Sequence, residues 1–440
     1  MSLSDVFQKL FESFDFLEDF LWGYFGVPII VVLGLYLTWL SGFAQIRLFP
    51  HVISRFFRYI NYKEAGHQGI HPLKAFFASV GGCIGIGNIV GVCTAVQVGG
   101  PGALFWIWVT ATLGMMLKYS EVYLGLRFRV DHGEEGYRGG PMYYLKHAYR
   151  SPFFPLLSAV LLCIYGVEIY QFRVIAVSLT QNFNFNELAT VLGLLLLVIF
   201  ASMGGVERVG NISSVIIPLF VIVYVFMGSW VIFSNIQFIP EVIGNVFVTA
   251  FNGHGAVGGF AGSTIMMAMS QGIRRGAYTG DVGIGYSSVI HSESNVTVPE
   301  KQASLVIFDM FLDTYIVCTT TILIILLSGV WDKPMEAGML IQTALGEYFP
   351  YMHLFMPIFL FLLGYSTINA YFVVGQNCAE YLSPNWGKRV FYGYAVAALV
   401  FFSFAETSQA LAVMAITGCL LLIVNCFGIF KLRKEIRYHF

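Results

Sequence analysis

Eleven long apolar runs divide the sequence and leave few folds open to it. A helix that crosses a bilayer needs about 20 mostly apolar residues, whereas strands of a membrane barrel would alternate in runs of about 10 residues. The runs do not alternate, and they cover 23–42, 75–98, 102–125, 153–179, 187–205, 211–233, 246–273, 304–330, 352–378, 390–405 and 407–430. We therefore expect an all-α integral membrane protein with about eleven transmembrane helices.

The composition favours one domain in a lipid bilayer over a soluble protein. The chain of 440 residues is 57% hydrophobic and 11% charged, whereas a soluble domain has roughly 25% charged residues. A net charge of −1 and the lack of a basic stripe exclude a nucleic-acid partner. The seven cysteines form no Cys-x-x-Cys pair, so we interpret them as packing residues. We treat 1–440 as a single transmembrane domain.

The charges between the runs predict an orientation. Lys and Arg concentrate in the cytoplasmic loops of membrane proteins. With the N-terminus outside and the C-terminus in the cytoplasm, twenty of the 24 Lys and Arg residues fall inside, and Arg274 and Arg275 are counted among them. The opposite orientation would place the same twenty cations outside, so we expect the first.

Two of the runs are rich in glycine. The second reads Ser-Val-Gly-Gly-Cys-Ile-Gly-Ile-Gly-Asn-Ile-Val-Gly over 79–91, and the seventh reads His-Gly-Ala-Val-Gly-Gly-Phe-Ala-Gly-Ser-Thr over 254–264. Glycine weakens a helix and lets backbone N–H and C=O groups approach a ligand. Small residues also serve helix packing in membranes, but paired interruptions in two halves of a chain indicate a transporter's binding site at the membrane midplane.

The spacing of these two runs predicts an internal repeat. They are five spans apart, and a repeated block with an odd number of spans must be inverted in the membrane. We expect a first inverted repeat over 75–233 and a second over 246–430, preceded by an extra N-terminal span and a cytoplasmic connector over 1–74.

Ionisable residues within the runs are costly in a bilayer and are candidates for function. Lys118 and Glu121 lie three residues apart on one helix face, which predicts an ion pair. Glu168 and Arg173 lie five residues apart in one run, where Arg173 either neutralises Glu168 loosely or lines an outer vestibule.

Two aspartates share a face of the eighth run. We expect Asp309 to be solvated near the cytoplasmic start of the span and interpret Asp313 as a candidate for a gating salt bridge. The sequence offers no nucleophile and base in a defensible arrangement, so we expect no enzyme activity and no cofactor.

Several ordered motifs resemble the alanine or glycine:cation symporter family, from about residue 69 to 430. The most specific are Gly-Gly-Pro-Gly-Ala-Leu-Phe-Trp-Ile-Trp over 99–108 and Gly-Gly-Pro-Met-Tyr-Tyr over 139–144. The resemblance implies a leucine-transporter-type fold, with a 5+5 inverted-repeat core in spans 2–11 and one added N-terminal helix.

The resemblance also implies a substrate site and a sodium site. The amides of Ile86 and Gly87 would bind a substrate carboxylate. The residues implied for the substrate pocket are Gly85, Ile86, Gly87, Asn88, Gln171, Gly259, Phe260, Ser263 and Tyr371. Those implied for sodium are the carbonyls of Gly81 and Ile84 and the hydroxyls of Ser366 and Thr367, because hard cations take oxygen ligands.

The function implied is import of alanine, glycine or a related small amino acid, coupled to sodium or alternatively to a proton, across the plasma membrane (the inner membrane of a bacterium). The chain departs from the family pattern at Ile86, Tyr371 and Arg173 and reads Thr-Gly-Asp-Val-Gly over 279–283 where Ser-Asn-Glu-Ala-Gly is usual. These departures leave the exact amino acid and the ion open. An amino-acid-gated channel or sensor on the same scaffold is the alternative, and counterflow of labelled substrate would separate the two.

Overall fold

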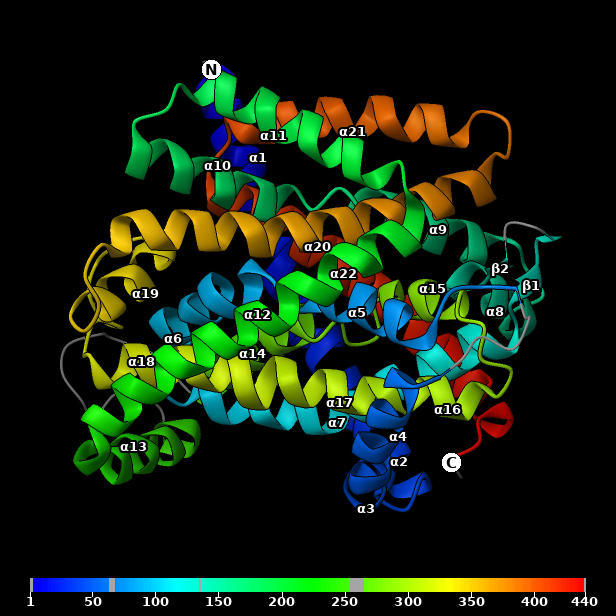
Figure 1. The fold of residues 1–440 in the computed structure, drawn as a ribbon, viewed down its shortest axis with the longest axis horizontal. Coiled ribbons are helices and arrows are strands. Elements are labelled where there is room, and N and C mark those ends of the chain that lie inside the picture. The colour runs from blue at the N-terminus through cyan, green and yellow to red at the C-terminus, as the bar shows by residue number, and fades with distance from the viewer. Residues whose placement is uncertain (1–2, 63–67, 134–135, 253–264, 439–440) are drawn as a thin grey trace.

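A computed structural model of the chain describes residues 3–62, 68–133, 136–252 and 265–438. Helices form nearly all of it. Most of them run along the long axis of the molecule, so that the loops gather at its two ends (Figure 1). The described strands are two short ones, β1 (Val130–Asp131) and β2 (Tyr137–Arg138), which pair antiparallel with Val130 opposite Arg138.

In the first half of the chain, short π-helical or non-helical segments interrupt several apolar helices. Its elements are α1 (Leu3–Leu21), η1 (Trp22–Gly26), α2 (Val27–Leu40), α3 (Ala44–Arg47), α4 (Phe49–Ile60), α5 (Pro72–Cys83), η2 (Gly87–Gly91), α6 (Val92–Gly99), α7 (Ala103–Arg127), α8 (Pro141–Ala148), α9 (Phe153–Tyr165), α10 (Ile169–Phe183), α11 (Glu187–Ser202) and α12 (Gly205–Ser234). The segments η1 and η2 are π-helical.

The second half repeats this mixture of long and interrupted helices. Its elements are η4 (Ile236–Phe238), α13 (Ile239–Asn252), α14 (Ile265–Thr279), α15 (Tyr286–Ser292), α16 (Pro299–Ala303), α17 (Leu305–Met310), η5 (Phe311–Cys318), α18 (Thr319–Leu327), α19 (Ala337–Gly346), α20 (Met352–Leu382), α21 (Gly387–Ser403), α22 (Thr407–Lys431) and η6 (Arg433–Glu435).

Within the described ranges, six helices are long and apolar enough to cross a membrane, and a seventh consists of α5 with η2 and α6, bent by 40° at the break. The chain is thus a multi-pass helical membrane protein. The number of eleven spans and the repeat boundaries stay predictions. Of the expected run 246–273, residues 253–264 lie outside the described ranges; α13 contains its start, and α14 contains its end and continues to Thr279.

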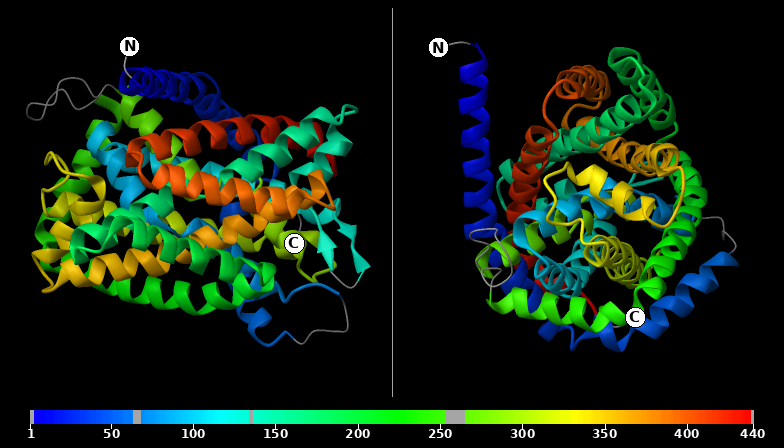
Figure 2. Two further views of the ribbon diagram at one scale, coloured as in Figure 1. Left: turned by 90° about the horizontal axis from the view of Figure 1, so that it is seen from above. Right: turned by 90° about the vertical axis from the view of Figure 1, so that its left-hand side faces the viewer.

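The N-terminal helix lies against the outside of the bundle, clearly separate in the right-hand view of Figure 2. Its inner surface is nevertheless attached by polar contacts. The indole nitrogen of Trp22 donates to the carbonyl of Ala415 in α22 at 3.0 Å, and Arg274 of α14 donates to Glu18 at 3.0 Å and to Asp19 at 2.8 Å.

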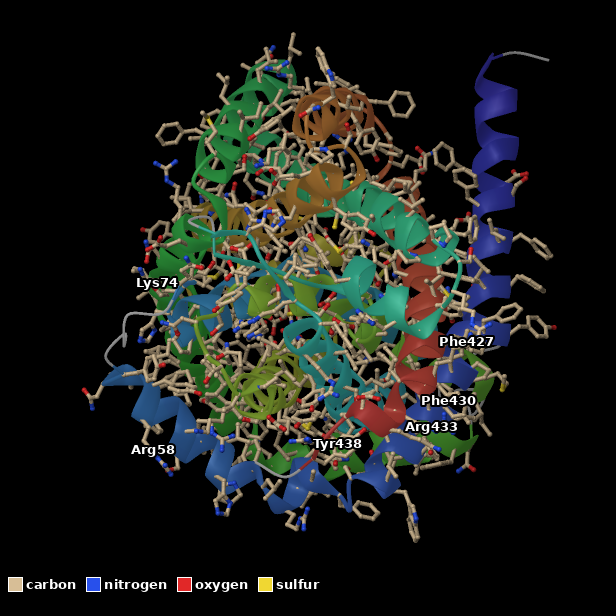
Figure 3. The ribbon with its side chains drawn as sticks, turned by 90° about the vertical axis from the view of Figure 1, so that its right-hand side faces the viewer. Arg58, Lys74, Phe427, Phe430, Arg433 and Tyr438 are labelled. Carbon is tan, nitrogen blue, oxygen red and sulfur yellow. The ribbon has the colours of Figure 1, made fainter. Side chains whose placement is uncertain are left out.

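The two ends of the bundle differ. The end that carries α19 is seen face on in the right-hand view of Figure 2. Figure 3 looks onto the opposite end, where Arg58, Lys74 and Arg433 lie around the rim. These are cations that the charge pattern assigns to the cytoplasmic side.

Candidate functional site

The first break in a helix lies where the glycine-rich second run predicts it. Helix α5 ends at Cys83, and Ile84 is extended, with φ −76° and ψ 94°, which turns its carbonyl out of the helical direction. The chain then resumes as π-helix at Gly87. Two N–H groups freed by the break are capped by side chains: Gly85 donates to Oδ1 of Asn88 at 2.9 Å, and Ile86 donates to Oε1 of Gln171 in α10 at 3.1 Å.

A second break separates α14 from α15, across residues 280–285. Gly283 and Gly285 have φ of +72° and +105°, and Asp281, with φ +53°, also takes the left-handed conformation. Oδ2 of Asp281 accepts from the backbone N–H of Ser287 at 3.0 Å and from its hydroxyl at 2.9 Å. The carboxylate therefore caps the first turn of α15, where negative charge is favourable.

The two breaks face each other. A Cβ on Gly87 would lie 3.1 Å from the ring of Tyr278 and 3.3 Å from Cγ2 of Thr279, at the end of α14. In the described ranges, the break that lies opposite residues 84–86 is the one after Thr279. The partner break predicted over 254–264 falls on residues outside these ranges and stays a prediction. Residues 253–264 lie outside the described ranges, and with them the predicted site residues Gly259, Phe260 and Ser263.

Three of the four residues implied for sodium, Gly81, Ser366 and Thr367, come together from α5 and α20, and Ile84 follows the end of α5. The hydroxyl of Thr367 donates to the carbonyl of Gly81 at 2.9 Å. The hydroxyls of Ser366 and Ser213 lie 2.8 Å apart, and Ser213 of α12 is an oxygen donor that the sequence did not indicate. Gly81 lacks a Cβ, which lets α5 approach both serines closely. Carbonyl and hydroxyl oxygens of this kind suit a hard cation.

Tyrosine rings and carboxyl groups lie beside the two breaks. The hydroxyl of Tyr371 donates to Oδ1 of Asp281 at 3.3 Å, and its ring stacks on Tyr286 with the centroids 4.0 Å apart. Ile86 points its side chain towards α20, because Gly364 leaves room for it there.

A third break, at residues 166–168 between α9 and α10, brings Glu168 to the same region. Glu168 has φ +51° and is only 1% exposed. Its Oε2 accepts from the hydroxyl of Tyr278 at 3.0 Å. The expected pairing with Arg173 is wrong, because Arg173 donates to Glu187 at 2.7 Å and to the carbonyl of Ser403.

The predicted pair of Lys118 with Glu121 is also wrong. Nζ of Lys118 donates to Oδ2 of Asp309 at 2.6 Å, and both side chains are fully buried. Glu121 instead accepts from the backbone N–H of Gly285 at 3.1 Å, which supports the second break. Asp309 is therefore not solvated, contrary to expectation.

Asp313 belongs to the polar contacts of the first break. Its Oδ1 accepts from Nδ2 of Asn88 at 2.6 Å, and Thr314 donates to Oδ2 at 2.8 Å. In the described ranges it forms no salt bridge, so the gating role predicted for it has no support in this conformation. Its role here is to orient Asn88, which in turn caps Gly85.

A vestibule of about 640 Å³ opens towards the end of the bundle that carries α19. Tyr170 and Val90 line it on the side of the breaks. Arg173 also lies in its wall, in agreement with the alternative in which this residue lines a vestibule. Arg275 also lines the vestibule. Arg274 and Arg275 therefore do not belong to a loop at the opposite end, and the count of cations expected there falls by these two.

Comparison with known proteins adds independent information. The model of the sodium:alanine symporter family matches residues 7–439. The amino-acid carrier protein AlsT of Bacillus subtilis is 31% identical over 387 residues, which cover 87% of this chain and 81% of AlsT. The sodium/alanine symporter AgcS of Methanococcus maripaludis is 29% identical over 443 residues, which cover 96% of each chain.

A solved structure shares the fold. The crystal structure of MhsT in complex with L-phenylalanine has a TM-score of 0.59 and 12% sequence identity, and the match covers 83% of this chain and 89% of MhsT. At this identity the likeness concerns the fold alone. The prediction of an all-α fold of the leucine-transporter type is confirmed.

Proposed function

Because the chain belongs to the sodium:alanine symporter family, we propose that it imports alanine, glycine or another small amino acid together with sodium. The family makes it a cation-coupled amino-acid transporter and not an enzyme. The identity of the substrate, the inward direction, the external N-terminus and the location in the plasma membrane are part of the proposal.

One observation carries the proposal most directly. At the break after α5, the N–H of Ile86 is not engaged by the backbone of its own helix but by Oε1 of Gln171, 3.1 Å away. A carboxylate oxygen of a substrate can replace that amide oxygen, because free N–H groups at a helix end favour anions. Ile86 and Gly87 would then bind the carboxylate, with Asn88, Gln171 and Tyr371 beside it.

Sodium is proposed to bind among the oxygens of Gly81, Ile84, Ser366 and Thr367. This site joins α5 to α20, so a bound cation would stabilise one arrangement of these two helices. The substrate site uses the same broken helix, a few residues further on. Each ligand therefore raises the affinity for the other, as coupling free energies require, and transport follows when one group of helices rocks against the other.

Uptake into proteoliposomes tests the proposal. A sodium gradient imposed on the purified protein should drive uptake of labelled alanine or glycine, and the Ser366→Ala, Thr367→Val double variant should lose the dependence on sodium. A proton gradient that drives uptake equally well without sodium would contradict sodium coupling. Absence of exchange between labelled and unlabelled substrate would favour the channel or sensor.

A further inference from the structure

Glu168 is a buried carboxyl group that the proposed sodium and carboxylate contacts do not use. It is the residue immediately before α10, and its left-handed backbone conformation, with φ +51°, directs the chain from α9 into α10. A residue other than glycine rarely takes this conformation. The surrounding structure therefore holds Glu168 at the break, and its side chain is removed from solvent.

The carboxyl group of Glu168 has a hydrogen-bond donor beside it but no cation. Tyr278 donates to Oε2 at 3.0 Å, and Gln171 lies three residues further along, in the first turn of α10. In the part of the chain that the structure describes, Glu168 forms no ion pair, because Arg173 is bound to Glu187 and Lys118 to Asp309. Since an unpaired buried carboxylate is costly, a cationic group supplied by a ligand would stabilise it.

Gln171 lies near both proposed ligand-binding groups. Its Oε1 accepts from the N–H of Ile86, as one oxygen of a substrate carboxylate would. Glu168 lies three residues before Gln171, at the start of the same helix, where its carboxyl group could meet a substrate ammonium. Gly85 makes the contact of Gln171 with Ile86 possible, because a Cβ there would lie 2.8 Å from Oε1 of Gln171. Gln171 thus lies beside an anion-binding N–H group and close in sequence to an acidic side chain, and a zwitterion needs both kinds of group.

The rings around Glu168 also suit an ammonium group. Tyr278 lies with its ring centroid 6.2 Å from that of Tyr170 and 6.4 Å from that of Tyr165. The faces of aromatic rings attract cations. The hydroxyl of Tyr165 is buried and has no hydrogen-bond partner among the described residues, so it is an additional acceptor.

We propose that Glu168 binds the ammonium group of the substrate while the N–H of Ile86 binds its carboxylate, so that the site selects zwitterionic α-amino acids over acids that lack the amine. This inference rests on the proposed function for the transport cycle, but it concerns recognition only. It makes Glu168 a specificity-determining residue, and it predicts that Gln171 leaves its present contacts when the substrate binds.

Paired ligands test the proposal. The affinity of purified wild-type protein and of Glu168→Gln is measured in sodium by thermal stabilisation. The ligands are a panel of small amino acids and, for each, the hydroxy acid in which a hydroxyl replaces the amine, for example alanine and lactate. Wild-type protein should bind the amino acid preferentially. Because a hydrogen bond to a charged group is lost, Glu168→Gln should weaken amino-acid binding about 10- to 100-fold and leave the weak hydroxy-acid binding unchanged.

Two controls separate recognition from folding. Tyr278→Phe removes one donor to the carboxyl group but retains its charge, so it should keep most of the preference for the amine. Stabilisation by sodium alone should be retained in Glu168→Gln, because the oxygens of Ser366 and Thr367 are unchanged.

The outcomes distinguish this inference from the proposed function. If wild-type protein prefers a different amino acid to alanine and Glu168→Gln abolishes that preference, the small-substrate proposal fails and the role of Glu168 stands. An unchanged preference in Glu168→Gln, an equal loss for amino and hydroxy acids, or no binding of any amine in the panel to wild-type protein would each overturn the role of Glu168.

Discussion

Lys118 and Asp309 form an ion pair without access to solvent, between α7 and α17. The nitrogen and oxygen atoms lie 2.6 Å apart, and Nζ of Lys118 is also 3.1 Å from Sγ of Cys83, the last residue of α5. The pair therefore lies directly behind the first break. Its charges compensate each other, which is the condition under which ionised groups are tolerated at membrane depth.

Removal of one partner should destabilise the protein strongly. Lys118→Met leaves the carboxylate of Asp309 buried without a cation, and the expected loss is about 3–5 kcal/mol. Thermal unfolding in detergent measures it. The double variant Lys118→Met, Asp309→Leu should recover most of the stability, because no charge is left unpaired. A double variant as unstable as the single one would contradict this account.

Asn88→Ala should abolish sodium-driven uptake while the protein still inserts into the membrane. The change leaves the N–H of Gly85 without its acceptor and removes one of the two side-chain donors to the carboxyl group of Asp313. The expected loss of stability is about 1–3 kcal/mol. Uptake and expression level are measured together. Asn235→Ala, at the far end of α12, removes a bond to Tyr348 instead and should transport normally.

At the residue scale, the sequence indicated polar residues better than it indicated their partners. Gln171 and Asn88 do lie at the first break, and Ser366 and Thr367 do lie beside Gly81. The predicted pairing of Lys118 with Glu121 was wrong, because helical spacing considers only neighbours on the same helix. The partner of Lys118 is 191 positions away in the sequence, a distance over which residue spacing predicts nothing.

The interrupted helices are the elements that distinguish this bundle from a set of simple spans. The break after α5 was predicted from glycine content, and the structure agrees. The break after α14 was missed, because it depends on backbone conformation at residues 281–285 rather than on the density of glycine. The Thr-Gly-Asp-Val-Gly stretch over 279–283 could have indicated this break. The expected span over 246–273 ended before that stretch, so the stretch was interpreted as part of a loop.

Gly285→Ala should destabilise the second break. Gly285 has φ +105°, and a Cβ there would collide with the ring of Pro141, the first residue of α8. Left-handed strain alone costs of order 1–3 kcal/mol. Gly393→Ala in α21 is the matched control, because a Cβ there meets nothing within 4 Å; it should leave the unfolding temperature unchanged or raise it. Equal behaviour of the two variants would contradict the structural role given to Gly285.

At the scale of the whole molecule, one end is hollow and the other is held closed. The vestibule lies at the α19 end. At the other end, Oε1 of Glu293 accepts from Arg138 at 2.7 Å and from Asn377 of α20 at 2.8 Å. These contacts join the loop after α15 to β2 and α20. In the proposed orientation this closed end lies in the cytoplasm, and the conformation then faces outwards.

Arg138→Ala should shift the protein away from the outward-facing conformation. A change of about 1 kcal/mol in this balance alters the ratio of two states about fivefold. Thr94 lines the vestibule, so a Thr94→Cys reporter should react with an impermeant thiol reagent measurably more slowly when Arg138 is replaced. Arg127→Ala, which breaks a half-exposed pair with Glu435, should leave that rate unchanged. An unchanged rate in Arg138→Ala would show that Arg138 does not hold this end closed.

A structure of the protein with alanine and sodium bound would test the central claim most directly. The account predicts a carboxylate oxygen within about 3 Å of the backbone nitrogen of Ile86, the ammonium group at the carboxyl group of Glu168, and Gln171 displaced from Ile86. Alanine bound elsewhere, with the bond from Ile86 to Gln171 intact, would contradict it.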